Sequence, residues 1–202
     1  MNKYRIIEFN QLNDIQKEKA VEIFIEGFGH MMTFSKDKKL LRSLFLSAMN
    51  PFFVLACLEE KDVLGILGFA TNKIRPIKLE MTHCVELFGK FKGVMICRQM
   101  NAIFQSNVVN EDTDFYVDIL ATTEYARGKG VATRLLDYCF ELPIYENYYI
   151  EVLSKNTNAQ RLYEKYGFVV YKRSRFSTTS LMGFGYPIKM KKTKNASFFT
   201  KQ

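Results

Sequence analysis

Residues 127–132 combine glycines with positive charge in a pattern that suits the binding of an anion. A strongly apolar segment at 115–121 precedes them, and their sequence is Arg127-Gly128-Lys129-Gly130-Val131-Ala132. Glycines leave the backbone free of side chains that would keep a phosphate group away. A helix starting at Val131 would add unpaired N–H groups and the positive end of its dipole. The pattern predicts a phosphate-binding loop, and a basic turn before a helix remains the alternative. The spacing is that of neither a Walker A loop nor a dinucleotide fingerprint.

Other residue types that often perform chemistry show no such pattern. His30 and His83 titrate near neutral pH, but neither has a partner at a recognisable spacing, so we interpret both as surface or loop residues. No cluster with the spacing of metal ligands appears, and we expect no metal. The cysteines contain no CxxC pair, so four reduced thiols in the core are the preferred interpretation. They are Cys57, Cys84, Cys97 and Cys139.

Apolar periodicity predicts the elements of the first half of the chain. Helices are expected at 14–28, capped by Asn13 or Asp14, and at 37–49, capped by Ser35. The segment 81–105 is long enough for one or two helices, and 106–114 is polar, as a loop would be. Strands are expected at 5–9, 51–58 and 63–71, the last two joined in a hairpin by a charged turn.

The second half alternates strands with helices around the glycine loop. Helices are expected at 131–140 and, as a shorter one, at 159–166. Strands are expected at 115–121, 148–153, 168–173 and 185–190. The phosphate-binding loop would therefore lie between a central strand and the helix that covers the sheet.

Size and composition fit one domain. The chain has 202 residues, of which 48% are hydrophobic and 25% charged, as in an ordinary globular protein. The first residues lack the apolar run of a signal peptide, and the apolar stretches are too short to span a bilayer, so we expect a cytoplasmic protein with no membrane partner.

The formal net charge is +8, which suits an anionic cofactor, nucleic acid or an anionic surface. Part of it lies in a C-terminal group consisting of Lys189, Lys191, Lys192 and Lys194. A solvated face is the simplest interpretation. Binding to nucleic acid through this basic tail is a weaker alternative, because no recognised nucleic-acid module accompanies the charge.

The loop and a second segment together resemble the GNAT superfamily of acyl-CoA-dependent N-acetyltransferases. The family signature is Gln or Arg, two residues, Gly, one residue, then Gly or Ala, and residues 127–132 fit it at every fixed position. Residues 156–168 resemble the family run N-x-x-A-x-x-L-Y-x-x-x-G-F. The resemblance covers about 116–171, and Glu124 stands where family members often have proline.

The resemblance implies an α/β (α+β) fold with a central, mixed, mostly antiparallel twisted sheet. Six to seven strands would be flanked by helices, and splayed central strands would form the acyl-CoA cleft. Residues 1–202 would form a single GNAT domain, with a probable helical insertion at 75–112 and a basic tail at 191–202. Oligomeric state stays open between monomer and homodimer.

The resemblance also implies the cofactor contacts. Backbone N–H groups of the loop would hold the pyrophosphate of acetyl-CoA, and its two basic side chains would add charge. These contacts are Arg127, Gly128, Lys129, Gly130, Val131 and Ala132. Leu120 and Thr122 would pair through their backbones with the pantetheine arm. Further contacts are Ala121, Asn156, Ala159 and Tyr163, although Asn156 also suits the N-cap of the following helix.

The family achieves the splayed strands with a β-bulge, which frees backbone groups from the ladder. A freed N–H near Ile119 or Leu120 would then polarise the thioester carbonyl. Tyr163 is the implied general acid, because a phenol with a pKa of about 10 is protonated at pH 7. Spacing alone also allows Tyr163 to be core, since it shares an apolar stripe with Ala159 and Leu162.

The general base is the least determined group. Asp118 would lie beside the bulge and Glu151 on the neighbouring strand, and either is able to accept a proton directly or through water. The alternative is that each carboxylate faces solvent or pairs with a nearby arginine.

These residues predict an N-acetyltransferase that transfers an acetyl group from acetyl-CoA to a primary amine by direct attack on the thioester. The amine belongs to a small molecule or a protein, and its identity stays open among polyamines, amino acids, aminoglycosides and protein amines. The acceptor pocket would be formed by 27–34, the insertion and 177–185. A non-catalytic acyl-CoA-binding regulatory module is the alternative.

Overall fold

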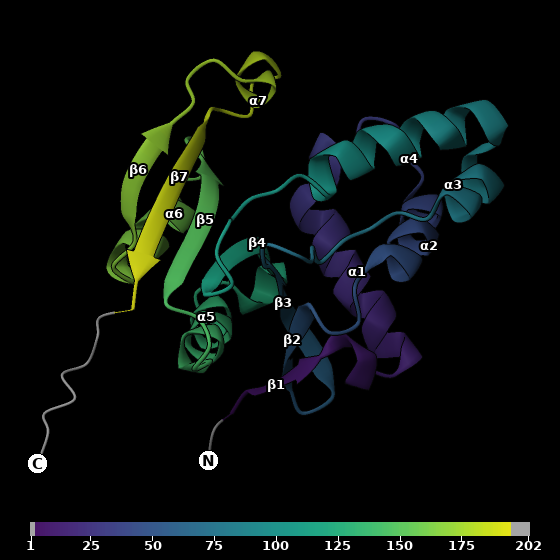
Figure 1. Cartoon of the computed structure of the whole chain (residues 1–202). Helices are drawn as coiled ribbons and strands as arrows, with labels where there is room; N and C mark the ends of the chain where they lie inside the picture. The colour runs from purple at the N-terminus through teal and green to yellow at the C-terminus, as the bar shows by residue number, and fades with distance from the viewer. Residues whose placement is uncertain (1–2, 195–202) are drawn as a thin grey trace, which may run out of the picture.

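The structure, a computed structural model, describes residues 3–194. In this part of the chain, seven strands form one mixed sheet in the order β1-β2-β3-β4-β5-β7-β6 (Figure 1). Every neighbouring pair is antiparallel except β4 and β5, which are parallel. The strands are β1 (Arg5–Glu8), β2 (Val54–Glu59), β3 (Asp62–Ala70), β4 (Asp114–Thr122), β5 (Asn147–Leu153), β6 (Val169–Arg173) and β7 (Pro187–Thr193). The predicted fold class is confirmed.

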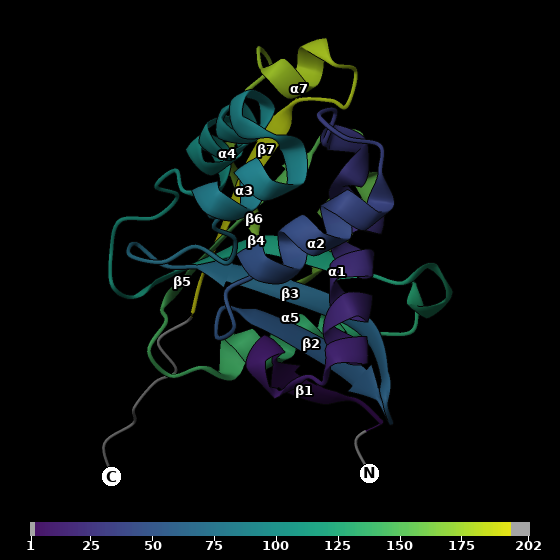
Figure 2. The same ribbon diagram turned by 90° about the vertical axis from the view of Figure 1, so that its right-hand side faces the viewer.

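Helices cover both faces of this sheet. The helices α1 to α4 pack on one face, and α5 and α6 share a second core with the other face (Figure 2). They are α1 (Asp14–Phe28), α2 (Lys38–Ala48), α3 (Met81–Phe88), α4 (Lys90–Phe104), α5 (Val131–Glu141), α6 (Thr157–Lys165) and a short α7 (Thr178–Leu181). No helix of residues 3–194 combines the length and apolarity needed to cross a bilayer.

Local signals set most of the element boundaries. The helix α1 has the predicted bounds, because Asn13 caps it and accepts a hydrogen bond from the Gln16 N–H at 2.9 Å. The predicted cap of α2 was wrong. Asp37 caps that helix through the N–H groups of its first turn, and the Ser35 hydroxyl accepts from the Asp37 N–H instead.

Two strands differ from the prediction. The strand β2 begins at Val54, because residues 51–53 form a turn in which the Phe53 N–H donates to the Asn50 carbonyl. The strand β7 extends to Thr193, since it pairs with the whole length of β5. Residues 191–193 of the expected basic tail are therefore strand, and 195–202 lie outside the described residues.

The segment predicted to hold one or two helices forms α3 and α4, which are separated only by Gly89 at φ 79°. Gly93 allows the two helices to touch, because a Cβ there would overlap the backbone of Cys84 and Val85. His83 does not lie in a loop. It is a partly exposed residue of α3, with its Nε2 at 3.1 Å from the Ser43 carbonyl oxygen of α2. All four cysteines are free and buried.

Candidate active site

A fork between β4 and β5 opens the centre of the sheet. The two strands pair only from Asp114↔Asn147 to Val117↔Ile150. Beyond that point β4 continues beside β3, and β5 continues beside β7, so the two halves of the sheet diverge (Figure 1). A cavity of about 570 Å³ lies at the fork, a size typical of ligand sites. The predicted splayed strands are thus present.

A β-bulge at Asp118 accompanies the fork. Val117 is opposite Phe69 and Ile119 is opposite Gly68, so Asp118 has no partner on β3. Because of the extra residue, side chains two positions apart on either side of the bulge point to opposite faces of the sheet. Val117 packs in the core beneath α5, whereas Ile119 packs in the core beneath α1. The sequence pattern of β4 therefore changes face in the middle of the strand.

Beyond the bulge, one edge of β4 faces the open fork. The Thr123 N–H donates to the Leu64 carbonyl of the β3 side at 2.9 Å. Successive residues of a strand point their backbone groups in opposite directions, so the backbone groups of Ile119 and Ala121 also face β3. The backbone N–H and C=O groups of Leu120 and Thr122 therefore face the fork. Of the two predicted oxyanion donors, Leu120 is the one with this orientation.

The glycine loop lies where β4 leads into α5. Gly128 and Gly130 have φ values of 73° and 83°, which favour glycine. Gly130 is the N-cap of α5, and among the described residues no side chain caps that helix end. Residues 127–130 are exposed. The cavity lining includes neither residues 127–132 of the loop nor Ala121 and Thr122 of the strand. These residues lie further along the chain, at the end of β4 and in its connection to α5.

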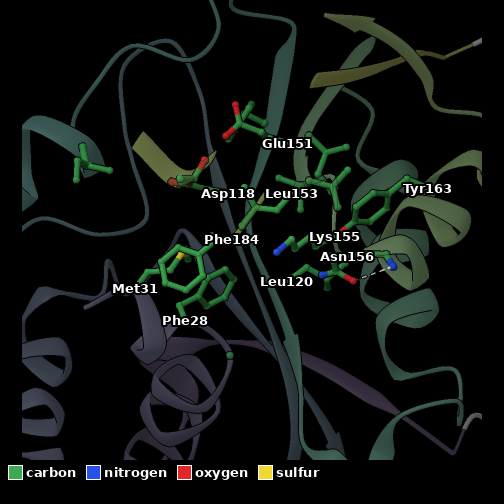
Figure 3. A pocket seen from close by; sticks show the side chains of 18 of the residues that line it. Phe28, Met31, Asp118, Leu120, Glu151, Leu153, Lys155, Asn156, Tyr163 and Phe184 are labelled. Carbon is green, nitrogen blue, oxygen red and sulfur yellow. Dashed lines mark hydrogen bonds between the residues drawn. The ribbon is translucent and has the colours of Figure 1, made fainter. Parts of the chain in front are cut away.

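Three predicted contacts enter the cavity from the α6 side, namely Asn156, Ala159 and Tyr163. Figure 3 shows Tyr163 across the cavity from Phe28 and Met31. Asn156 is the N-cap of α6 and accepts from the Ala159 N–H at 3.2 Å, in agreement with the capping role considered for it. Tyr163 is 6% exposed. Burial raises the pKa of its phenol, so the group stays protonated at neutral pH.

The bulge residue Asp118 is paired with Arg75. Its Oδ2 lies 2.8 Å from Nη2 and 3.1 Å from Nε of the arginine, and the two side chains are 16% and 9% exposed. The arginine also donates through Nη1 to the carbonyl of Ser106. Burial raises the pKa of Asp118, and the charge of Arg75 opposes that rise. Asp118 therefore pairs with an arginine, which is one of the two alternatives that the sequence left open for it.

Glu151 is the carboxylate of the site whose nearest cation is further away. It follows Ile150, the last residue of β5 that pairs with β4, and its Oε2 lies 3.9 Å from the Lys189 Nζ. Partial burial raises its pKa, the charge of Lys189 lowers it, and the charge of Asp118 raises it further. Figure 3 shows Glu151 and Asp118 near each other at one side of the cavity.

The other walls come from all three segments expected to form the acceptor pocket. The first segment contributes Gly27, Phe28 and Met31, the helical segment Arg75, Ile103 and Phe104, and the last one Thr179 and Phe184. The side chain of His30 lies outside the described residues. Among residues 3–194, no three His, Cys, Asp or Glu side chains gather closely enough to hold a metal ion.

Sequence reasoning did not single out two polar residues that line the cavity, Tyr116 and Lys155. Lys155 donates from Nζ to the Gly183 carbonyl at 2.7 Å and so joins the start of α6 to the β6–β7 connection. The signal in the sequence that could have identified Lys155 as a lining residue is its position next to Asn156. Tyr116 precedes the bulge by two residues, and burial together with the charges of Glu151 and Asp118 raises its pKa.

Comparison with known proteins agrees with this outline. A family model described as an acetyltransferase (GNAT) domain matches residues 93–170, which run from α4 into β6. No curated protein matches the chain by sequence.

Solved structures share the fold at low sequence identity. An N-acetyltransferase from Staphylococcus aureus Mu50 has 15% identity and a TM-score of 0.61 over 93% of this chain and 99% of that one. A GNAT family acetyltransferase from Elizabethkingia anophelis with acetyl-CoA bound has 11% identity and a TM-score of 0.55, over 96% and 100%. Ard1 from Thermoplasma volcanium has 17% identity and a TM-score of 0.54, over 95% and 97%. At these identities the likeness establishes the fold.

Proposed function

We propose that this chain, whose residues 93–170 match a GNAT acetyltransferase domain and which shares the fold of GNAT structures, transfers an acetyl group from acetyl-CoA to a primary amine. The amine belongs to a small molecule or a protein. One observation carries the proposal: the open edge of β4 beyond the bulge leads directly into the uncapped start of α5. A free strand edge and a helix N-terminus in one continuous stretch suit a ligand with an amide-containing arm and a pyrophosphate.

The residues present fit acetyl-CoA. Leu120 and Thr122 offer backbone groups to the pantetheine amides. The N–H groups at the start of α5 are available to the pyrophosphate, since no described side chain caps them. Arg127 and Lys129 add positive charge beside them. When bound, acetyl-CoA supplies an acetyl thioester, whose carbonyl carbon is attacked by the amine and whose sulfur leaves as a thiolate.

Glu151 is our first candidate for the base that removes a proton from the acceptor ammonium. It lines the cavity, its nearest cation lies at 3.9 Å, and its pKa is raised. A carboxylate with a raised pKa is a better proton acceptor than an ordinary one. Asp118 is the second candidate, but the two close contacts with Arg75 occupy one of its oxygens.

The other two roles fall to opposite sides of the cavity. We assign the stabilisation of negative charge on the thioester oxygen to the Leu120 N–H, because it is directed toward the fork. We assign the protonation of the leaving thiolate to Tyr163, because it lines the cavity from α6 with a protonated phenol. The reaction would then proceed by direct attack, with no covalent acyl-enzyme.

An amine-panel assay with acetyl-CoA that detects released thiol tests the proposal. We expect amine-dependent thiol release by the parent protein. Release that no amine increases, in a protein that still binds acetyl-CoA by calorimetry, would instead support a non-catalytic acyl-CoA-binding module. The Gly130→Asp variant serves as the control for background hydrolysis.

A further inference from the structure

The acceptor end of the cavity is chiefly apolar and aromatic. Phe28 at the end of α1 and Met31 in the turn that follows it face the cavity from one side, and Ile103 and Phe104 at the end of α4 line it from another. Phe104 is held in place by an edge-to-face contact with Phe45 of the core, at 6.2 Å between ring centroids. Ile103 is 62% exposed, so it lies at the mouth. The wall is thus firm at Phe104 and open to solvent at Ile103.

The charges around this cavity leave one carboxylate without a close cationic partner. Arg75 and Asp118 form a close ion pair, and Nη1 of the arginine is bonded to Ser106. Lys155 donates to a backbone carbonyl near α7. Glu151 has only the distant Lys189, so it is the carboxylate best able to receive a cation.

We propose, on the basis of the function proposed above, that the acceptor is a primary amine carried on an apolar body, and that Ile103 and Phe104 of α4 select that body. One ammonium group fits one available carboxylate, and the carbon skeleton fits the aromatic and aliphatic walls. A second ammonium on the acceptor would be desolvated without a close carboxylate partner, which lowers its reactivity.

Two sources provide this chemistry. One is a small alkyl or arylalkyl amine, and the other is the N-terminal residue of a polypeptide with a bulky apolar side chain. Both present one amine next to an apolar group. Only the polypeptide continues into a peptide chain beyond the amine-bearing carbon, so matched small molecules and short peptides separate the two sources.

The first test compares acceptors of matched length with a thiol-release readout. We expect kcat/KM for hexylamine to exceed that for 1,6-diaminohexane by on the order of tenfold or more. A peptide starting with phenylalanine and one starting with serine form the second arm. Turnover confined to the phenylalanine peptide would identify a polypeptide acceptor, and turnover of hexylamine would identify a small one.

The second test moves the preference by mutation. Ile103→Glu places a carboxylate at the mouth, so we expect kcat/KM for 1,6-diaminohexane to rise relative to hexylamine by roughly tenfold. Met95→Glu is the matched control, because Met95 is 52% exposed on the same helix and does not line the cavity. A relative gain cannot arise from poor folding, which lowers both rates together.

The outcomes separate this inference from the proposed function. Preference of the parent protein for the diamine or for the serine peptide would overturn the apolar acceptor and leave the acetyltransferase standing. An unchanged ratio in Ile103→Glu would remove α4 from acceptor selection. Thiol release that no amine increases would overturn the acetyltransferase itself.

Discussion

At the scale of single residues, the proposed chemistry depends on how the protein changes the ionisation of a few side chains. Burial keeps the Tyr163 phenol protonated, while partial burial and a neighbouring carboxylate make Glu151 a stronger base. The acid and the base enter the cavity from α6 and β5. This arrangement allows one proton to be accepted and another to be delivered in the same cavity.

We expect Tyr163→Phe to lower kcat about 100-fold, the usual effect of losing a general acid. The affinity for acetyl-CoA should change little, because the ring remains. Steady-state kinetics and calorimetry measure the two effects separately. Tyr138→Phe, on α5 and outside the cavity lining, is the control. Equal rates for Tyr163→Phe and the parent would exclude the acid role.

The pH dependence of kcat/KM tests the base. Glu151 accepts a proton only when ionised, so activity should fall as the pH drops through its raised pKa. The charge of Asp118 contributes to that rise, and Asp118→Asn removes it and leaves the positive charge of Arg75 unpaired. Both changes lower the pKa of Glu151, so the acidic limb should move to lower pH.

Glu151→Gln should remove this limb together with most of the activity, whereas the exposed Glu164→Gln should leave the profile unchanged. A profile that Asp118→Asn does not move would show that Glu151 is not the titrating group.

At the scale of elements, the bulge and the glycine loop turn an ordinary strand and helix into a binding surface. The bulge ends the pairing between β4 and β5 and exposes an edge. The positive φ values of Gly128 and Gly130 let the chain pass from that edge into α5 without side chains over the helix end. Tyr4 supports the loop by donating to the Lys129 carbonyl at 2.9 Å.

Gly130→Asp should weaken acetyl-CoA binding by at least about tenfold, because it places a negative charge where a pyrophosphate is expected to bind. Isothermal calorimetry measures the change. Gly89→Asp is the control, since Gly89 is also a helix N-cap with positive φ and open space where a Cβ would be added. It places the same charge at another helix and imposes greater backbone strain, because its ψ is 163° against 6° at Gly130. Unchanged affinity in Gly130→Asp would disprove the pyrophosphate site.

At the scale of the whole molecule, the sheet separates two hydrophobic cores, and the fork is where the two halves of the sheet part. A ligand in the fork would contact β4, the start of α5 and α6 together. Binding that favours the folded state alone stabilises it in proportion to ligand occupancy. Two of the lysines expected in a basic C-terminal tail are strand residues, because Lys191 and Lys192 belong to β7.

Acetyl-CoA at 100 times its Kd should raise the Tm by roughly 5–10 °C, from about 2.7 kcal/mol of stabilisation in a chain of this size. A chain ending at Lys194 should show the same shift, because it keeps all of β7. Scanning calorimetry with and without ligand checks both. Loss of the shift on truncation, or salt-sensitive binding of the full chain to nucleic acid that truncation abolishes, would favour the basic-tail alternative.

The sequence by itself determined the parts of this protein that depend on short stretches of chain. Helical periodicity and the Asn13 cap determine α1, and the two glycines of the loop determine the turn into α5, because each signal acts within a few residues. The GNAT resemblance rests on the same kind of local pattern, and the splayed sheet was expected from that resemblance.

Only the tertiary structure decided which distant residues meet. Arg75 and Asp118 are 43 positions apart, and no spacing rule joins them. The wall formed by α4 depends likewise on how α3 and α4 pack, and the full length of β7 depends on its pairing with β5. Contacts between distant segments are fixed by packing and burial rather than by local periodicity, so the partner of Asp118 and the character of the acceptor cavity appear only in the folded chain.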